Sequence, residues 1–377
     1  MKKIILIAVI LSLTFTTGCW DMKEINERIF PYSVGLDIVD KKDFKKGRYE
    51  ITFTYPNINA LGKQAIQEDI VYLASIRGNN MFEGASNVSD RLQKPMFLRD
   101  LKVVVIPESL ARDKNLIKEI IDGLSRDYIV NKVINFVVVK TTAKDFMQTV
   151  SKSKKQTEIE GLLYGLLRNE QGSTKFINST LNSFVKDMYS CGATLVPVAR
   201  REGEDIIVDS NAVFKDYELI GYLNQEDNRN IGLLTNKTKD LSINTEYEGA
   251  DLALRTPRPR LKKQLIKSEK NLKIRYSIEL RGQMEEYILG RGDQLDNKEK
   301  VNDMEKTLEK DLKKSIEKTI EKLQKDLNTD TIGVAEHLYK FNPKIWEEIE
   351  DDFDDIFPHI DIDLDINITI RRRGLTK

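Results

Sequence analysis

Few side chains in this 377-residue chain are suited to nucleophilic or metal chemistry, and Cys19 stands out among them by its position. The thiolate of a cysteine is a nucleophile that other groups can modify covalently. Cys19 comes directly after Gly18, at the end of a stretch that begins with an apolar run. Its position therefore indicates that the thiol is a site of modification and not of catalysis.

The stretch before Cys19 has three parts. A basic head at residues 2–3 precedes an unbroken apolar run at residues 4–11, and residues 12–18 turn smaller and more polar. The apolar run is too short to cross a hydrocarbon core, which takes about 20 residues. A basic start, a short apolar core and small residues before a cleavage point are typical of a signal peptide. With a cysteine directly after the cleavage point, the stretch resembles the bacterial lipobox.

Lipobox processing has a clear physical consequence. Cleavage between Gly18 and Cys19 leaves Cys19 as the first residue, carrying an S-linked diacylglycerol and an N-terminal acyl chain such as palmitate. Each buried methylene contributes about 0.8 kcal/mol to membrane attachment, and one acyl chain alone holds only marginally. Because a diacylated cysteine carries two long chains, we expect the mature protein to stay on the extracytoplasmic face of a membrane. Thr16 stands where lipoboxes usually carry Leu.

The remaining candidates for chemistry are isolated from one another. His337 and His359 are accompanied by no G-x-S-x-G nucleophile motif, and with Cys191 they are too few for an ordinary zinc site. The acidic run at residues 351–355 lacks the spaced oxygen ligands and the glycine of an EF-hand loop. The Gly-Arg-Gly at residues 290–292 lacks the strand-to-helix setting of a phosphate-binding loop. We therefore expect no catalytic, cofactor-binding or metal-binding residues, and the chain is not expected to be an enzyme.

Composition narrows the class of protein further. Lys+Arg and Asp+Glu are 60 each, so the formal net charge is zero, which argues against a broad nucleic-acid-binding surface. Hydrophobic residues make up 40% and charged residues 32%, which is typical of globular domains. If Cys19 is lipidated, Cys191 has no partner in the chain. We therefore expect no disulfide, and stability must come from packing.

The first half of the mature chain alternates strands and helices. Compact β-branched runs at residues 101–106 and 133–139 are typical of buried central strands. Residues 49–55 alternate large and polar side chains, which predicts a half-buried strand. Helices are expected at residues 80–94 and 107–124. This succession predicts an α/β or α+β layer.

The second half is richer in strands. Residues 224–230 are expected to form a polar loop between two of them. The stretch at 272–280 and the final segment at 360–371 alternate apolar and polar residues, which predicts a sheet with one wet face. The strands expected here are at residues 206–208, 211–214, 218–223, 241–245, 252–255, 261–266, 272–280 and 360–371.

A long amphipathic helix is predicted from Asn297 to Leu327. Its apolar residues recur every three or four positions and form one stripe: Val301, Met304, Leu308, Leu312, Ile316, Ile320, Leu323 and Leu327. The stripe suits a coiled-coil partner helix. It also suits a helix lying on the protein's own sheet, which requires only a single stripe and which we favour.

These elements predict a multi-domain α+β fold with mixed or antiparallel sheets, each covered by helices. We expect a removed signal peptide at 1–18, an N-terminal α+β domain at 19–200, a middle β-rich domain at 201–265, and a C-terminal α+β domain at 266–377. The last of these contains the long helix and the final strand. The charged turn at 200–205 is the candidate boundary of the first domain.

Several stretches of the chain resemble, in order, the Ger(x)C family of spore germination lipoproteins. The Gly-Cys-Trp-Asp at 18–21 that follows the signal stretch is the most specific of them. The others are weak singly and convincing together: Glu24-Ile25, Arg99–Ile106, Arg126-Asp127, Ala212–Lys215, Leu219–Leu223, Asn342–Trp346, Phe357-Pro358 and the final strand ending in Gly374. The resemblance covers essentially the whole mature chain.

This resemblance implies the C subunit of a nutrient germinant receptor, needed for spore germination in response to small nutrients. It implies a place on the spore inner membrane beside membrane-embedded A-type and B-type subunits, a non-enzymatic fold of three α+β domains, and no nucleic-acid partner. Cys19 is the one functional position that the family supplies, as the site of lipid attachment. No ligand-binding residue is carried over, because germinant recognition in the family is associated mainly with the membrane-embedded partner.

A second hypothesis is an extracytoplasmic solute-binding lipoprotein that captures the germinant directly. Tyr222, the segment 224–230 and Trp346 would then line a cleft, although aromatic residues are more often packed in cores. A third hypothesis, an extracytoplasmic hydrolase, needs a nucleophile–base pair that the sequence does not display.

Overall fold

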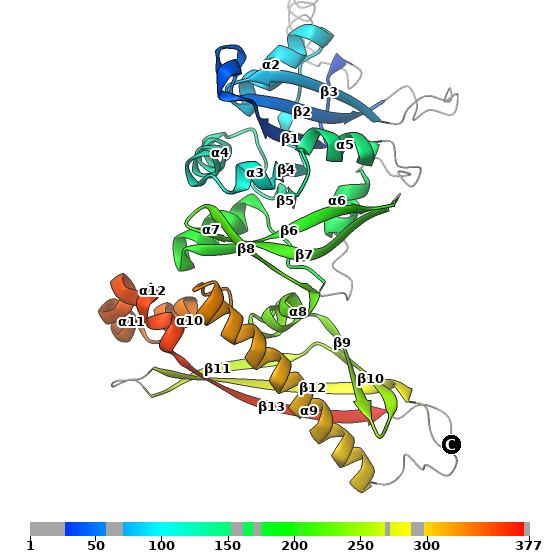
Figure 1. Ribbon diagram of the computed structural model, residues 1–377, viewed down its shortest axis with the longest axis vertical. Coiled ribbons are helices and arrows are strands. Elements are labelled where there is room, and N and C mark those ends of the chain that lie inside the picture. The colour runs from blue at the N-terminus through cyan, green and yellow to red at the C-terminus, as the bar shows by residue number, and fades with distance from the viewer. Residues whose placement is uncertain are drawn as a thin grey trace, which may run out of the picture.

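The computed structural model describes residues 27–57, 71–151, 161–168, 175–203, 205–267, 272–287 and 298–372. Their helices and strands build an elongated molecule with two sheets that follow one another along its long axis (Figure 1). Cys19 and the expected cleavage point after Gly18 lie outside the described residues. None of the helices within these ranges is long and apolar enough to cross a bilayer.

The first sheet has eight strands in the order β3-β2-β1-β4-β5-β6-β7-β8. Neighbours from β1 through β4 and β5 to β6 run parallel, whereas antiparallel strands are added at both ends. The sheet is therefore mixed, as expected. The strands are β1 (Ser33–Ile38), β2 (Tyr49–Pro56), β3 (Val71–Gly78), β4 (Val103–Pro107), β5 (Asn135–Val139), β6 (Ala193–Glu202), β7 (Asp205–Lys215) and β8 (Glu218–Leu223).

The centre of this sheet is buried on both faces. Every residue of β4 and β5 is buried, which confirms the two central strands expected from their β-branched runs. On one face lies a core shared with helices α2 (Met81–Leu92), α3 (Glu108–Ala111), α4 (Lys114–Arg126) and α7 (Leu181–Cys191). On the other face lies a core shared with α5 (Ala143–Ser151) and α6 (Leu162–Arg168).

Side-chain caps decide where several of these helices begin. Asn80 accepts a hydrogen bond from the backbone N–H of Glu83 and starts α2. The helix expected over residues 107–124 is in fact two helices, because Asp113 accepts from two backbone N–H groups and starts α4 anew. Buried Asp37 of β1 accepts from the N–H groups of Ala143 at 2.7 Å and Lys144 at 2.9 Å, so a strand side chain caps α5.

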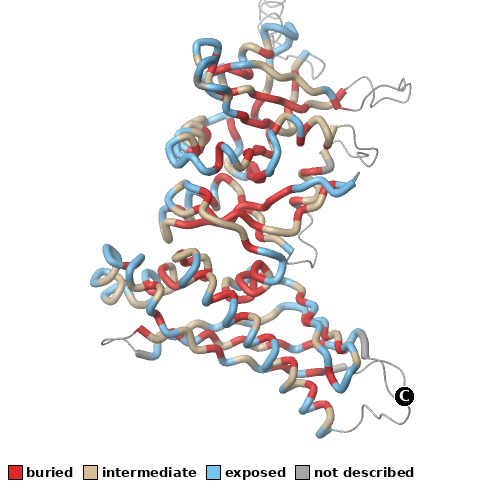
Figure 2. Tube along the Cα trace, viewed as in Figure 1, coloured by how far each residue is buried: buried red, intermediate tan, exposed pale blue. Residues whose placement is uncertain are grey.

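The second sheet is built around its longest strand, β12. This strand pairs antiparallel with β10 and β11 along one edge and parallel with β13 along the other. Figure 2 shows buried and exposed residues alternating along these strands, as expected for a sheet with one wet face. The strands are β9 (Asp240–Tyr247), β10 (Ala250–Pro257), β11 (Arg260–Lys267), β12 (Lys273–Tyr287) and β13 (Asp361–Arg372).

Helix α9 (Lys298–Glu321) lies across one face of this sheet (Figure 1). Its apolar stripe is buried in one core with residues of β9, β12 and β13. The helix also protects the free edge of β13, since Glu309 and Glu305 accept hydrogen bonds from the backbone N–H groups of Ile368 and Ile370. The favoured expectation, a helix on its own sheet, is confirmed.

The polar segment 224–230 was expected to be a loop, and this expectation was wrong. It forms the first turns of helix α8 (Gln225–Leu234), where Asn224 and Asp227 build a reciprocal capping box. Buried Asn230 donates hydrogen bonds to Ser315 at 2.8 Å and Thr319 at 2.9 Å on α9. Because the segment packs against α9 through polar side chains, it has no apolar periodicity that could reveal it.

Polar contacts join the two sheet regions. Lys186 of α7 pairs with Glu336 of α10 (Val334–Phe341) at 3.1 Å. Lys215 of β7 donates to the carbonyl oxygen of Asn328 at 2.8 Å and pairs with Asp354 of α12 (Phe353–Ile356) at 3.0 Å. The fold is multi-domain α+β, as expected. The expected boundaries at 200/201 and 265/266 fall within β6 and β11, and the division into three domains stays a prediction.

Candidate functional site

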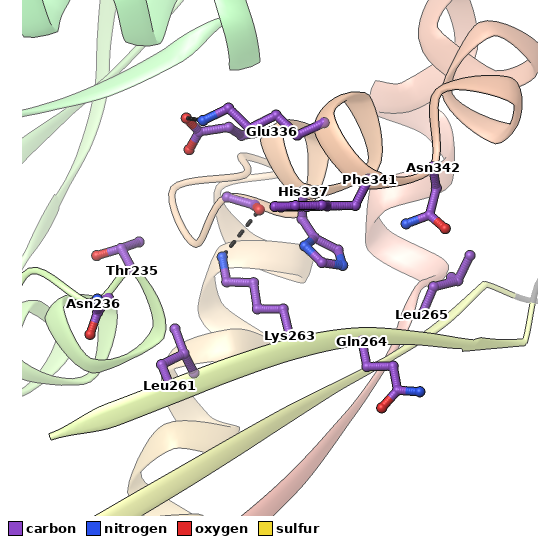
Figure 3. A pocket seen from close by; sticks show the side chains of 12 residues that line it. Thr235, Asn236, Leu261, Lys263, Gln264, Leu265, Glu336, His337, Phe341 and Asn342 are labelled. Atoms are coloured by element: carbon purple, nitrogen blue, oxygen red, sulfur yellow. Dashed lines mark hydrogen bonds and ion pairs between the residues drawn. The ribbon is translucent and has the colours of Figure 1, made fainter.

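Two neighbouring hollows in the second sheet region are lined largely by polar and charged side chains. The first has a volume of about 540 Å³ and lies between the end of α8, strand β11 and helix α10 (Figure 3). Its described lining combines cationic, amide and aromatic side chains from these elements. Such a mixture suits the binding of a polar ligand or peptide more than the binding of an apolar one.

Lys263 of β11 lies at the base of this hollow (Figure 3). Its Nζ donates to the carbonyl oxygen of Ile332 at 2.6 Å and to that of Gly333 at 3.2 Å, and lies 5.0 Å from the ring centre of Tyr276. Burial lowers the pKa of Lys263, while buried Asp330 opposes this shift. The ammonium group of Lys263 is thus hydrogen-bonded to the backbone at the start of α10, so its role is structural.

Gly333, whose carbonyl oxygen accepts a hydrogen bond from Lys263, is in a position that favours glycine. Its φ is +74°, in the left-handed region that favours glycine. A Cβ there would lie 3.1 Å from Nζ of Lys263. Backbone conformation and space therefore both favour glycine at this turn.

The upper rim of the hollow is formed by α10. Glu336 accepts hydrogen bonds from Lys340 at 2.7 Å and from Lys186 at 3.1 Å, and these lower the pKa of Glu336 to about 2. The rings of His337 and Phe341 lie 5.1 Å apart, and burial lowers the pKa of His337. A carboxylate that is ionised at neutral pH and an imidazole in tilted contact with a phenyl ring are suited to binding, and neither forms a nucleophile–base pair with a neighbour among the described residues.

The other candidates from the sequence are dispersed. Burial raises the pKa of the Cys191 thiol to about 12, so this cysteine is unreactive. His359 is the last residue of a short 3-10 helix (Phe357–His359) before β13, whereas His337 belongs to α10. Within the residues that the structure describes, no group of three or more His, Cys, Asp or Glu side chains is arranged to hold a metal ion.

The residues expected to line a solute cleft are divided between different parts of the molecule. Tyr222 packs against the core under the first sheet. Trp346 packs against the core of the second sheet, with its ring 5.2 Å from that of Phe353. The polar segment 224–230 is occupied by contacts between α8 and α9.

The second hollow, with a volume of about 610 Å³, was not anticipated from the sequence. It adjoins the first at Asn236 and Leu261, which line both. Four arginines line it, and the only local signal is the Pro-Arg-Pro-Arg at 257–260. The other two arginines come from β12 and β13 and are far away in the sequence.

Both halves of the chain match known protein families. Residues 21–201 match the family described as "Spore germination protein N-terminal domain". Residues 209–374 match the family described as "Spore germination B3/ GerAC like, C-terminal". The two matches follow one another in the chain and together cover nearly all of it beyond residue 20.

Relatives of similar length are found in Bacillus subtilis (strain 168). Spore germination protein YndF is 24% identical over 399 residues, which cover 99% of this chain and 97% of the relative. Spore germination protein KC is 25% identical over 404 residues, which cover 99% of this chain and 96% of the relative.

A solved structure, that of the GerBC protein, has the same fold. It superimposes with a TM-score of 0.61 at 17% identity and covers 93% of this chain and 99% of its own. At this identity the likeness speaks for the fold alone. The matches to both family domains, residues 21–201 and 209–374, show that the chain belongs to the Ger(x)C family of spore germination proteins.

Proposed function

We propose that this protein is the lipid-anchored, non-catalytic C subunit of a nutrient germinant receptor, held on the extracytoplasmic face of the spore inner membrane. The observation that carries the proposal is the family match over both halves of a chain in which Cys19 directly follows a signal-like stretch. The named relatives are spore germination proteins, which supports a role in that process.

The anchor sets which part of the protein lies near the membrane. Residues 20–26 span at most about 25 Å when fully extended. They lead to β1, which belongs to the end of the molecule formed by β1, β2 and β3 (Figure 1). The first sheet is therefore proposed to lie next to the bilayer, with the second sheet farther from it.

Tethering explains how a protein without an active site contributes to a receptor. A lipid anchor raises the local concentration of the protein at the membrane, so that weak contacts with A-type and B-type membrane subunits suffice. The polar groups of the first hollow favour binding over catalysis, because Lys263 and Glu336 are already held by partners within the chain.

The first experiment removes the proposed anchor in the sporulating bacterium. Cys19→Ala is expected to leave the fold intact but to release the protein from the membrane fraction and to slow germination with nutrients. Cys191→Ala is the matched control, because it removes the other cysteine of the chain without touching the anchor. Normal membrane fractionation and normal germination of the Cys19→Ala strain would contradict the proposal.

The second experiment tests the partners. The full-length protein, tagged at its C-terminus, is purified from detergent-solubilised spore membranes. Recovery of A-type and B-type subunits with it is expected, and the Cys19→Ala protein is expected to recover less of both. A wild-type protein that purifies without either subunit would contradict the role in a receptor. This result would not bear on the lipid anchor, which the first experiment tests.

A further inference from the structure

The arginine-lined hollow lies on the open face of the second sheet, where β10 ends and β11 begins. Its volume is about 610 Å³. Glu279 is the one carboxylate among the described residues that line it. The four arginines are Arg258, Arg260, Arg281 and Arg371.

Strand register brings three of these arginines together. Arg260 of β11 lies opposite Glu279 of β12, and Arg281 follows two residues later on the same face. Thr369 of β13 lies opposite Arg281, and Arg371 follows Thr369 by two residues. Because successive side chains of a strand alternate between faces, Arg260, Arg281 and Thr369 lie on one face. Arg371 lies at a bulge in the pairing with β12 and also lines the hollow. The neighbouring residues Ile278, Leu280, Ile368 and Ile370 are buried in the core beneath α9, so this is the face that α9 does not cover.

The charges of the hollow are not balanced by the residues that the structure describes. Glu279 pairs with Arg260 at 3.8 Å and with Arg281. Arg258 and Arg371 pair with no carboxylate in the described part of the chain. Four arginines against one glutamate leave a surplus of three positive charges around one hollow.

The other end of the same face shows the opposite arrangement. There Lys273 pairs with Asp361 at 2.8 Å, and Arg275 pairs with Asp363 at 2.5 Å. Cations and carboxylates are thus matched across β12 and β13 at one end, while at the other end four arginines share the single carboxylate of Glu279. Unpaired like charges at short distance repel one another, so the cluster costs stability unless an anion joins it.

The backbone at Arg258 is held in place before any ligand arrives. Pro257 and Pro259 flank it and restrict the backbone of the turn. Arg258 has a φ of +54°, and its N–H donates to the carbonyl oxygen of Lys239 at 2.7 Å. A constrained turn loses little entropy on binding, which favours affinity.

We propose that this hollow binds a small anion that carries at least two negative charges on phosphate or carboxylate oxygens. Guanidinium groups present forked N–H donors that match the oxygens of both groups. Anionic lipid headgroups offer the same chemistry. The free anion is favoured, because the hollow belongs to the second sheet and the chain enters its described part at the first sheet (Figure 1). The choice of a free anion over a lipid headgroup rests on the proposed anchor, whereas anion binding by the hollow depends neither on the anchor nor on the receptor role.

Binding is tested with pyrophosphate as the probe and full-length protein in neutral detergent, by isothermal titration and thermal unfolding at constant ionic strength. Wild-type protein is expected to bind pyrophosphate saturably and to unfold at a higher temperature in its presence. Arg258→Gln combined with Arg371→Gln should weaken binding by about tenfold or more, since each charged hydrogen bond contributes strongly. Arg275→Gln is the control: it removes an arginine from the same face that is already paired with Asp363.

Two measurements distinguish a binding site from a group of arginines that only stabilises the fold. Without pyrophosphate, the double variant should be at least as stable as wild type, because it removes repulsion and no ion pair. A loss of stability in the double variant without pyrophosphate would contradict the proposal. So would equal binding by wild type and double variant, or a thermal shift that sodium chloride reproduces.

A final experiment distinguishes a free anion from an anionic lipid headgroup. The same proteins are mixed with vesicles of phosphatidylglycerol or of phosphatidylcholine. Binding to phosphatidylglycerol vesicles that depends on Arg258 and Arg371, without binding of pyrophosphate, would overturn the proposal in favour of a lipid surface. Pyrophosphate binding with equal retention of wild type and double variant on both vesicles supports it.

Discussion

The two sheets of this protein use their faces in opposite ways. The first sheet is covered on both faces, and the residues of its central strands β4 and β5 are all buried. The second sheet is covered by α9 on one face and leaves the other to charged residues of β11, β12 and β13. The first sheet therefore has little room for polar chemistry, whereas the second can be stable and still present charges to a ligand.

This difference between the two sheets also predicts which substitutions change stability and which change binding. Apolar burial stabilises a fold by about 25 cal/mol per Å², whereas exposed ion pairs contribute little. Substitutions in the first sheet and beneath α9 should therefore act on stability. Substitutions on the open face of the second sheet should act mainly on what the protein binds.

The largest effect is expected at the centre of the first sheet. Phe136→Ala removes a fully buried ring that packs 5.7 Å from Phe184, and should lower the free energy of unfolding by about 3–5 kcal/mol. Phe341→Ala is the matched control, because that ring is 70% exposed. Urea unfolding followed by circular dichroism measures both. Similar losses for the two variants would contradict the contrast between buried and open surfaces.

A smaller loss is expected beneath α9. Leu308→Ala should lower the free energy of unfolding by about 2–5 kcal/mol, below the loss for Phe136→Ala because fewer atoms are removed. Lys314→Ala, on the same helix and exposed, should change it little. If both variants of α9 behave alike in urea unfolding, the helix does not rest on the sheet as described.

The junction between the regions should depend on pH. Hydrogen bonds from Lys340 and Lys186 lower the pKa of Glu336 from 4.5 to about 2. Because its folded-state pKa is depressed, Glu336 stabilises the fold above pH 4.5, and this contribution disappears as the pH falls toward 2.

Glu336→Gln tests this dependence. The stability difference between wild type and variant should be largest above pH 4.5 and should vanish toward pH 2. Thermal unfolding across this range measures it, with Glu347→Gln, an exposed residue of α11 (Pro343–Ile349), as control. A difference that is constant with pH would show that the ion pairs with Lys340 and Lys186 do not contribute.

The smallest effect on stability is expected at the matched end of the open face. Arg275→Gln breaks a surface pair with Asp363, and such pairs contribute little because water screens them. The unfolding curve should lie close to that of wild type, and closer than that of either core variant. A loss as large as that of Leu308→Ala would show that this face is part of the stabilising core after all.

Much of the fold could be predicted from the sequence, because burial leaves a local pattern. The β-branched runs of β4 and β5, the stripe of α9 and the alternation of β12 and β13 each report which side chains face a core. Helix α8 was missed for the converse reason. Its buried residues Asn228 and Asn230 are polar, and their side-chain N–H groups donate to the carbonyl oxygen of Lys175 and to side chains of α9, respectively.

Sequence alone determined most of the strands and helices and the family to which the chain belongs, because both depend on the order of neighbouring residues. Lipidation at Cys19 stays a prediction from the sequence. Only the tertiary structure decided which charges meet. Arg258 and Arg371 line one hollow although more than a hundred residues separate them. The parallel pairing of β13 with β12 and the turn between β10 and β11 bring them together, and neither the register of distant strands nor the balance of charges across them is encoded in local periodicity.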